Sequence, residues 1–335
     1  MRRLLIAVAS LALAVAGMGL VGCGDGDGED SVRVPQSPRE FVETANWDGV
    51  HSGALVAIFS LNVPSKGEFF SLILANHFVG LGKEEAPQML LESTSNGRLA
   101  GREVDFNGFM SVRPQDALIV YGKAFHEQQY DIDRRTFREL RAKFEEAQEG
   151  NGSGKLTACL DAAGDAEVAG LIHHFRIKGH NQDRYGVPVT WFSGDIDVPH
   201  LFDLGALLNE DPACGAQLKA VGSPSVSQLE AAKSTLRGRV KGAKVLLALD
   251  KKGVLRSFTA TATVMNPPDE NIALKLELRL SGNDEVGLLG SRNGRPLDAL
   301  LGQFGIDSET VRNAGSDEAV IGFLKAFSRG LTGSS

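Results

Sequence analysis

Three histidines lie close together in the middle of the chain, and imidazoles are common metal ligands. His173 and His174 are adjacent, and His180 follows in the same segment. The first two belong to a predicted strand, in which neighbouring residues point to opposite faces. The adjacent imidazoles therefore do not converge on one ion, and we expect no metal site here.

The next predicted strand ends in residue types that hydrolases use. Ser193 precedes Gly194, but a nucleophile elbow also needs a glycine two residues before the serine, and that glycine is absent. Asp195 and Asp197 share one face of the strand and could act as paired carboxylates. Because a helix is expected directly after them, we interpret both as helix caps. We predict no catalytic residue and no cofactor.

A glycine-rich segment, Gly150–Lys155, resembles a phosphate-binding loop only superficially. The Walker A pattern needs four residues between its first glycine and the Gly-Lys pair, and then a serine or threonine. Here the spacing is three and Leu156 follows the lysine, which indicates a flexible linker. The net charge of −7 also argues against a nucleic-acid-binding surface, which is usually basic.

The N-terminus has the layout of an export signal. Two arginines precede an uncharged apolar run over residues 4–21. Residues 20–23, Leu-Val-Gly-Cys, resemble the bacterial lipobox. The resemblance implies cleavage after Gly22, acylation of Cys23, and anchoring by this lipid at the outer face of the bacterial cell membrane.

Two other interpretations fit the apolar run, namely a transmembrane helix and a secretory signal without a lipid. Residues 23–37 are rich in Gly, Asp, Ser and Pro, which cannot build a core, so we expect a flexible tether. Its acidic residues do not form a calcium loop, because Gln36 occupies the position at which an EF-hand closes with glutamate.

Only Cys159 and Cys214 remain beyond Cys23. An even number of cysteines in an exported protein predicts a disulfide. Such a bridge would close a loop of about 55 residues, and chain entropy would then contribute about 4 kcal/mol to stability. Two buried free thiols are the alternative. A zinc site is not expected, because no second pair of soft ligands accompanies the cysteines.

Apolar and polar residues alternate over many short segments, which is typical of antiparallel strands with one solvent-exposed face. The clearest alternation covers residues 257–264 and 272–280. We predict strands over residues 51–63, 68–79, 88–99, 103–112, 117–127, 167–178, 187–196, 244–249, 254–264 and 272–280. Helical spacing and polar caps predict helices over residues 38–46, 133–148, 156–163, 198–208, 225–239 and 316–329.

Strands with one apolar face need a cover on that face. We therefore predict an α+β fold, in which helices pack on the concave face of a curved antiparallel β-sheet, or half-barrel. Residues 38–282 would form this single domain, after a signal peptide over residues 1–22 and the tether. Residues 283–335 would add loops and a helix that pack on the same domain.

Small side chains on the predicted concave face leave room for a cavity beneath the helices. They would equally let a helix approach the sheet closely, so composition alone does not decide between the two. The predicted lining of an apolar ligand cavity is Ala57, Phe59, Phe258, Ala260, Ala262, Val264, Leu274 and Leu276.

Four motifs, taken in their order along the chain, resemble the actinobacterial LppX/LprG-type lipoproteins, relatives of the LolA and LolB carriers. They are the lipobox, the triplet His51-Ser52-Gly53, residues 187–198 (VPVTWFSGDIDV), and residues 254–258 (VLRSF) after a glycine turn. The resemblance covers most of residues 38–282 and implies a LolA-like half-barrel that binds or transports acylated lipid. The cysteine pair and the long tail depart from the family pattern.

The predicted function is therefore a non-enzymatic, monomeric carrier of an acylated lipid or glycolipid that works with a membrane transporter. Each buried CH₂ group contributes about 0.8 kcal/mol, so an acyl chain binds without specific polar groups. A cell-envelope module that binds a protein partner is the second hypothesis. A hydrolase with a scattered triad is the third.

Overall fold

The computed structural model describes residues 33–46, 50–80, 88–99, 101–112, 118–121, 129–131, 138, 164–211, 214–215, 224–266, 270–282, 294–296, 299 and 302. Their strands join into one 12-stranded sheet. In order across the sheet, the strands are β12 (Arg295–Pro296), β6 (Tyr130–Asp131), β5 (Leu118–Tyr121), β4 (Arg102–Val112), β3 (Gln88–Leu99), β2 (Glu68–Val79), β1 (Ser52–Val63), β11 (Glu270–Gly282), β10 (Leu255–Asn266), β9 (Val240–Asp250), β8 (Pro188–Ile196) and β7 (Ile172–Gln182).

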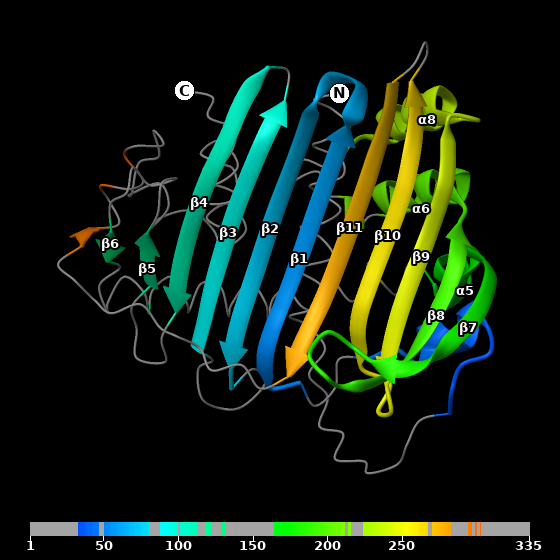
Figure 1. Cartoon of the computed structure of the whole chain (residues 1–335), viewed down its shortest axis with the longest axis horizontal. Helices are drawn as coiled ribbons and strands as arrows, with labels where there is room; N and C mark the ends of the chain where they lie inside the picture. The colour runs from blue at the N-terminus through cyan, green and yellow to red at the C-terminus, as the bar shows by residue number, and fades with distance from the viewer. Residues whose placement is uncertain are drawn as a thin grey trace.

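Two antiparallel meanders meet in the middle of this sheet. Strands β1 to β6 are successive neighbours, as are β7 to β11, and β1 pairs with β11 from Gly53↔Gly282 to Asn62↔Ala273. The pairs are antiparallel except β6 and β12, which run parallel. The sheet is open and its strands curve together (Figure 1). The predicted α+β class with a large curved antiparallel sheet is confirmed.

Four described helices accompany the sheet, together with a short 3₁₀ turn, η1 (Pro64–Lys66). They are α2 (Pro38–Thr44), α5 (Asp165–Gly170), α6 (Val198–Glu210) and α8 (Val226–Leu236). Figure 1 shows α5, α6 and α8 behind the half of the sheet that contains β7 to β11. Helix α6 packs against α8, and α2 packs against α5.

Local sequence explains where these helices begin. The Ser37 hydroxyl accepts a hydrogen bond from the backbone of Glu40 at 3.2 Å, and Pro38 follows the cap. Ser225 and Gln228 form a reciprocal capping box at the start of α8. These contacts satisfy backbone N–H groups that have no partner within the helix. The helices predicted at residues 38–46, 198–208 and 225–239 are thus confirmed.

Alternation along each strand gives the sheet two different faces. We call the side that carries the helices the helix face, and the opposite side the open face. Leu236 of α8 packs against a buried cluster on the helix face that contains Phe59, Leu61, Val63, Val264 and Ile272. A second cluster on this face contains Phe41 of α2 with Phe192, Val245, Leu247 and Leu249. A third buried cluster contains Leu55, Phe78, Val254 and Leu280.

Gly53 shows how closely β1 and β11 approach each other. A Cβ atom at this position would lie 2.3 Å from the carbonyl oxygen of Ser281, and the backbone φ of Gly53 is +155°. The next residue, Ala54, donates its N–H to the Ser281 hydroxyl at 2.9 Å. Glycine in the triplet His51-Ser52-Gly53 is therefore required by the close strand contact.

Some predicted boundaries were wrong. The strand predicted over residues 167–178 starts only at Ile172, because residues 165–170 form α5. It continues to Gln182 into the predicted loop. Strand β9 begins at Val240 instead of residue 244. Of the strand predicted over residues 117–127, the described part is β5, and the short strands β6 and β12 were not predicted. The remaining described strands agree with their predictions within a few residues.

Several predictions concern residues outside the described ranges. They include the signal peptide, Cys23 and most of the tether, the linker at Gly150–Lys155, and the helices predicted over residues 133–148 (apart from Arg138), 156–163 and 316–329. Of the tail, Arg295 and Pro296 pair with β6, and the Gly294 N–H donates to Asp131 at 2.7 Å. Domain boundaries otherwise stay predictions.

Candidate functional site

The eight residues predicted to line a cavity all lie on the helix face. Strand register places Phe59, Leu276 and Ala260 side by side across β1, β11 and β10. One row further, Leu274 lies beside Ala262. The other three are Ala57 and Phe258, which both lie beside Leu278, and Val264, which lies beside Ile272. The structure therefore brings the predicted set together on one surface.

Burial divides this set into two groups. Ala57, Phe59 and Val264 are buried. By contrast, Phe258, Ala260, Ala262, Leu274 and Leu276 are only half-buried. Leu274 packs on the cluster beneath α8, whereas Phe258 packs on the cluster around Phe192. The half-buried residues between these two clusters are Leu276, Ala260 and Ala262, which we call the apolar strip.

The apolar strip is shallow because two of its three side chains are methyl groups. On either side of Leu276 and Ala260, the same cross-strand row continues to Phe59 and Val245, which are buried. A half-buried apolar surface between two packed clusters can accept further apolar atoms with a gain in free energy. Whether the strip opens into a ligand cavity stays a prediction.

Of the two cysteines predicted to form a disulfide, only Cys214 lies among the described residues. Cys214 is fully buried and disulfide-bonded. Its N–H donates to the Asp211 side chain at 2.9 Å, directly after helix α6. Cys159 lies outside the described residues, so its pairing with Cys214 stays a prediction.

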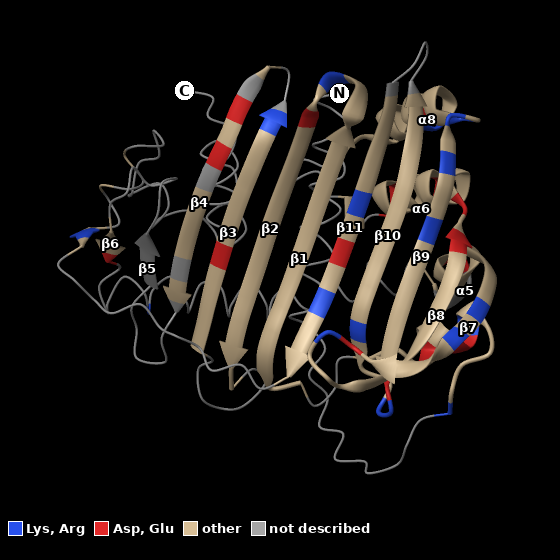
Figure 2. Cartoon of the chain, in the orientation of Figure 1, with Lys and Arg blue, Asp and Glu red and all other residues tan. Residues whose placement is uncertain are grey.

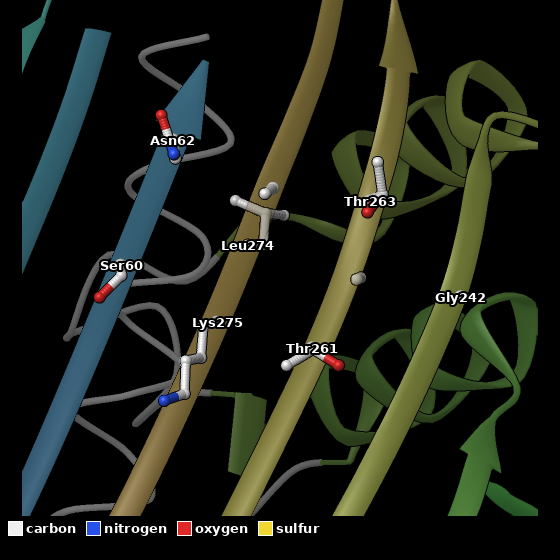
Figure 3. A pocket seen from close by; sticks show the side chains of 9 residues that line it. Ser60, Asn62, Gly242, Thr261, Thr263, Leu274 and Lys275 are labelled. Atoms are coloured by element: carbon white, nitrogen blue, oxygen red, sulfur yellow. The ribbon is translucent and has the colours of Figure 1, made fainter. Parts of the chain in front are cut away.

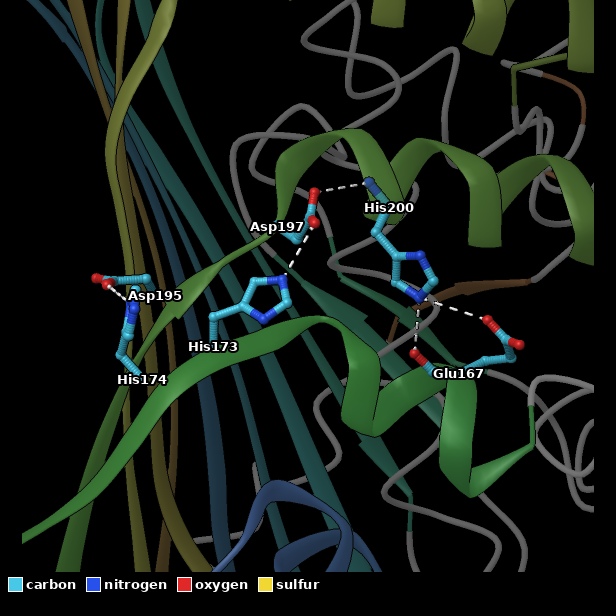
Figure 4. Close-up of polar contacts among 6 residues, drawn as sticks. All are labelled: Glu167, His173, His174, Asp195, Asp197 and His200. Atoms are coloured by element: carbon cyan, nitrogen blue, oxygen red, sulfur yellow. Dashed lines mark hydrogen bonds and ion pairs between the residues drawn. The ribbon is translucent and has the colours of Figure 1, made fainter.

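Histidine–carboxylate contacts cluster where β7 and β8 meet the helices (Figure 4). His173 Nε2 lies 3.1 Å from Asp197 Oδ2, and His174 Nδ1 lies 2.8 Å from Asp195 Oδ2. His173 points toward the helices, whereas His174 points to the other side of the strands (Figure 4). His180 lies apart from them, with Nδ1 2.9 Å from the Thr190 hydroxyl.

One further histidine joins this region without having been predicted. His200 Nε2 lies 3.1 Å from the backbone oxygen of Glu167 and 3.4 Å from its carboxylate, which ties α6 to α5. This contact was missed because Glu167 was predicted to belong to a strand, whereas it lies in α5. Within the described ranges, no group of three His, Cys, Asp or Glu side chains could hold a metal ion.

The two aspartates of this region have separate roles. Asp197 caps α6 by accepting the N–H of His200 at 3.0 Å, as predicted. This backbone hydrogen bond, followed by the one with His173, lowers the pKa of the Asp197 carboxyl. Asp195 is not a cap, which corrects the prediction, because it belongs to β8 and contacts His174 instead. The chain turns into α6 between them, so they do not form a carboxylate pair.

Three charged residues, Lys275, Glu277 and Arg279, form an ionic row along β11 on the open face. Glu277 is 7% exposed and contacts both Lys275, at 2.7 Å, and Arg279. Burial alone would raise the pKa of the Glu277 carboxyl, but the hydrogen bonds and charges of Arg279 and Lys275 outweigh it, and the pKa is lowered. Glu277 is therefore ionised at neutral pH. It is a structural charge on an otherwise hydroxyl-rich surface.

Ser193 and Gly194 both contact residues of β7. The Ser193 hydroxyl accepts a hydrogen bond from Arg176 at 3.4 Å. Gly194 lies beneath Ile172, where a Cβ atom would meet a methyl group at 2.3 Å. A packing requirement thus accounts for the glycine. Also within the described ranges, no helix combines the length and apolar character that a membrane crossing requires.

Comparison with known proteins assigns no family. No protein-family model matches the chain, and no curated protein matches it. Among solved structures, a DUF1329 family protein from Desulfovibrio piger is similar at 11% sequence identity, over 75% of this chain and 93% of that chain. Its TM-score is 0.20, which is too low to support a statement about fold or function.

Proposed function

We propose that this chain is a lipid-anchored protein of the bacterial cell envelope that binds an acylated lipid or glycolipid on its helix face. The observation that carries the proposal is the apolar strip of Leu276, Ala260 and Ala262. These residues lie on the helix face, yet they are only half-buried, so part of their apolar surface stays accessible to solvent. An apolar surface left between two packed clusters is an expected place for acyl chains.

The energy of such binding comes from burial. Each methylene removed from water contributes about 0.8 kcal/mol, so ten methylenes contribute about 8 kcal/mol, close to the free energy of a micromolar complex before the costs of ordering. No conspicuous polar group is needed on the strip. This agrees with the apolar character of all eight predicted lining residues.

The anchor is the second part of the proposal. Acylation at Cys23 would hold the domain near the membrane, and the tether of residues 23–37 would let it reach a partner. The motifs that resemble the LppX/LprG-type lipoproteins support this assignment. In this proposal the protein has no catalytic role, acts as a monomer, and exchanges its lipid with a membrane transporter.

Lipid binding is tested with the mature chain carrying Cys23→Ser, so that no anchor contributes lipid. The protein is expressed in an actinobacterial host and analysed by native mass spectrometry and lipid extraction. We expect co-purified acylated lipid. Ala260→Trp should abolish it by filling the strip, whereas Thr259→Trp, one residue away on the open face, should retain it. Circular dichroism confirms that both variants are folded.

Two results would contradict lipid binding. One is an empty protein that also takes up no lipid from vesicles. The other is an equal loss of lipid in both tryptophan variants. An empty protein would favour the second hypothesis, an envelope module that binds a protein partner. The anchor is tested separately, since metabolic labelling with a palmitate analogue should mark the full chain and not its Cys23→Ser variant.

A further inference from the structure

A shallow depression lies on the open face, on the side of the sheet away from the helices. Its volume is about 260 Å³, and its lining includes Ser60, Asn62, Gly242, Thr261, Thr263 and Lys275. Figure 3 shows these residues on β1, β11, β10 and β9, with helices behind the strands. The depression thus presents hydroxyl, amide and ammonium groups beside the apolar residues Ala262, Ala273 and Leu274.

Strand register brings two further lysines to this depression. Thr261 lies between Lys275 on β11 and Lys244 on β9. Thr263 lies opposite Lys241 on β9. Directly opposed residues on one face of an antiparallel pair have Cβ atoms about 5 Å apart. Three lysines therefore flank the two threonines on this face.

A bulge in β9 makes this arrangement possible. In a regular strand, residues three positions apart point to opposite faces. Here the register shifts between Thr261 and Thr263, so that Lys244 and Lys241 both oppose threonines of the open face. Gly242 lies in the bulge with φ +62°, a conformation that favours glycine. Its backbone lines the depression, where no atom lies within 4 Å of a Cβ position.

Positive charge exceeds negative charge around the depression. Lys275 is paired with Glu277, which also binds Arg279, and Lys244 lies opposite Asp195, which binds His174. Lys241 and Lys244 are exposed, and neither makes an ion pair with another described residue. Figure 2 shows basic residues along β9 and on both sides of the acidic residue of β11. This surface is basic on a chain whose net charge is −7.

We infer that this depression binds a phosphate group, with Lys241, Lys244 and Lys275 supplying charge and Thr261 and Thr263 supplying hydroxyl donors. Lysine binds phosphate as a flexible point charge, and threonine hydroxyls commonly donate to phosphate oxygens. The phosphate belongs either to the headgroup of an anionic phospholipid or to a soluble phosphate ester. Ala262 of the apolar strip also lines the depression, but the three lysines and the two threonines lie on the face of the strands opposite the strip.

The test uses the mature chain with Cys23→Ser and two probes. Inorganic phosphate is titrated by calorimetry, and flotation measures binding to vesicles of phosphatidylglycerol against vesicles of phosphatidylcholine. We expect binding to at least one anionic probe that weakens as salt is raised. Lys241→Gln and Lys244→Gln should each weaken it about fivefold, since one lysine near an anionic surface contributes about 1 kcal/mol.

Lys251→Gln is the matched control, because Lys251 is an exposed lysine in the turn between β9 and β10, away from the depression. Binding to phosphatidylglycerol alone identifies the lipid headgroup as the source, and binding to inorganic phosphate identifies a soluble ligand. Absence of binding to both probes overturns the inference. So does an equal loss in all three glutamine variants, which would reflect net charge only. Absence of phosphate binding would not contradict lipid binding at the apolar strip. Absence of lipid binding at the strip would likewise not contradict phosphate binding at the depression.

Discussion

The two faces of the central strands differ in what holds them in place. On the helix face, Phe59 and Val264 pack in buried clusters, and shape and apolar contact decide their position. On the open face, Glu277 is held by Lys275 and Arg279 among serines and threonines, and charge decides its position. A single strand, β11, thus combines a tightly packed apolar surface with a surface held by charge.

The largest expected effect lies in the core of the helix face. Phe192 is fully buried, stacks on Phe175 at 5.3 Å between ring centroids, and meets the edge of Phe41 at 5.3 Å. Phe192→Ala should reduce the free energy of unfolding by about 4 kcal/mol, through lost burial and the cavity left behind. Urea denaturation measures this. Leu246→Ala, on the open face of β9, is the control, and it should reduce the free energy of unfolding by less than about 1 kcal/mol. Equal losses in the two variants would show that the two faces do not differ in packing.

The open face should respond most strongly at Glu277. Glu277→Gln leaves Lys275 and Arg279 without their carboxylate, and we expect a loss of about 2 kcal/mol in the free energy of unfolding. Thr259→Val is the control, because Thr259 lies opposite Glu277 on β10 and the change alters no charge. Comparing the free energies of unfolding of the two variants separates the effect of charge from that of packing. A neutral effect of Glu277→Gln in urea denaturation would show that the ionic row contributes nothing to stability.

Acid should remove the same contribution. The pKa of the Glu277 carboxyl in the folded chain lies below its ordinary value of 4.5, so its ionised form stabilises the fold above that pH. This stabilisation is lost as pH falls from about 4.5 through the lower folded-state pKa. The unfolding free energy measured between pH 6 and pH 3 should therefore fall more steeply for the natural chain than for Glu277→Gln. Parallel curves would contradict this.

The smallest contrast concerns two aspartates on either side of the end of β8. Asp197→Ala removes the cap of α6 and should cost about 1 kcal/mol. Asp195→Ala removes only an exposed contact with His174 and should cost less than about 0.5 kcal/mol. Thermal unfolding of both variants gives the order. A larger loss at Asp195 would mean that the fold depends on its contact with His174 more than the exposure of the two side chains indicates.

Local patterns predicted the parts of the fold that depend on local rules. Alternation assigned Ala260 and Ala262 to the apolar face of β10, and Asp197 was predicted as a cap, because a strand period and a cap each need only a few neighbouring residues. Helix α5 was missed because six residues are too few to show a helical period. Val168 and Ala169 also continue the apolar pattern of the strand that follows.

The phosphate-binding surface was missed for a different reason. Lys241 and Lys244 are three positions apart, so a regular strand would separate them, and only the register against β10 brings them together. Pairing between strands is set by the whole sheet, which no single segment encodes. The available sign was Gly242, since an isolated glycine within a strand indicates a bulge.

The pairing of β1 with β11 also affects how the chain folds while it is being synthesised. Ala54 and its partner Ser281 are 227 positions apart. One edge of β1 therefore emerges from the ribosome long before the strand that will cover it, while β2 covers the other edge almost at once. Such distant pairing slows folding, and an uncovered edge invites pairing with other chains. Protection of nascent chains by a holding chaperone is thus most needed at β1, until β11 arrives.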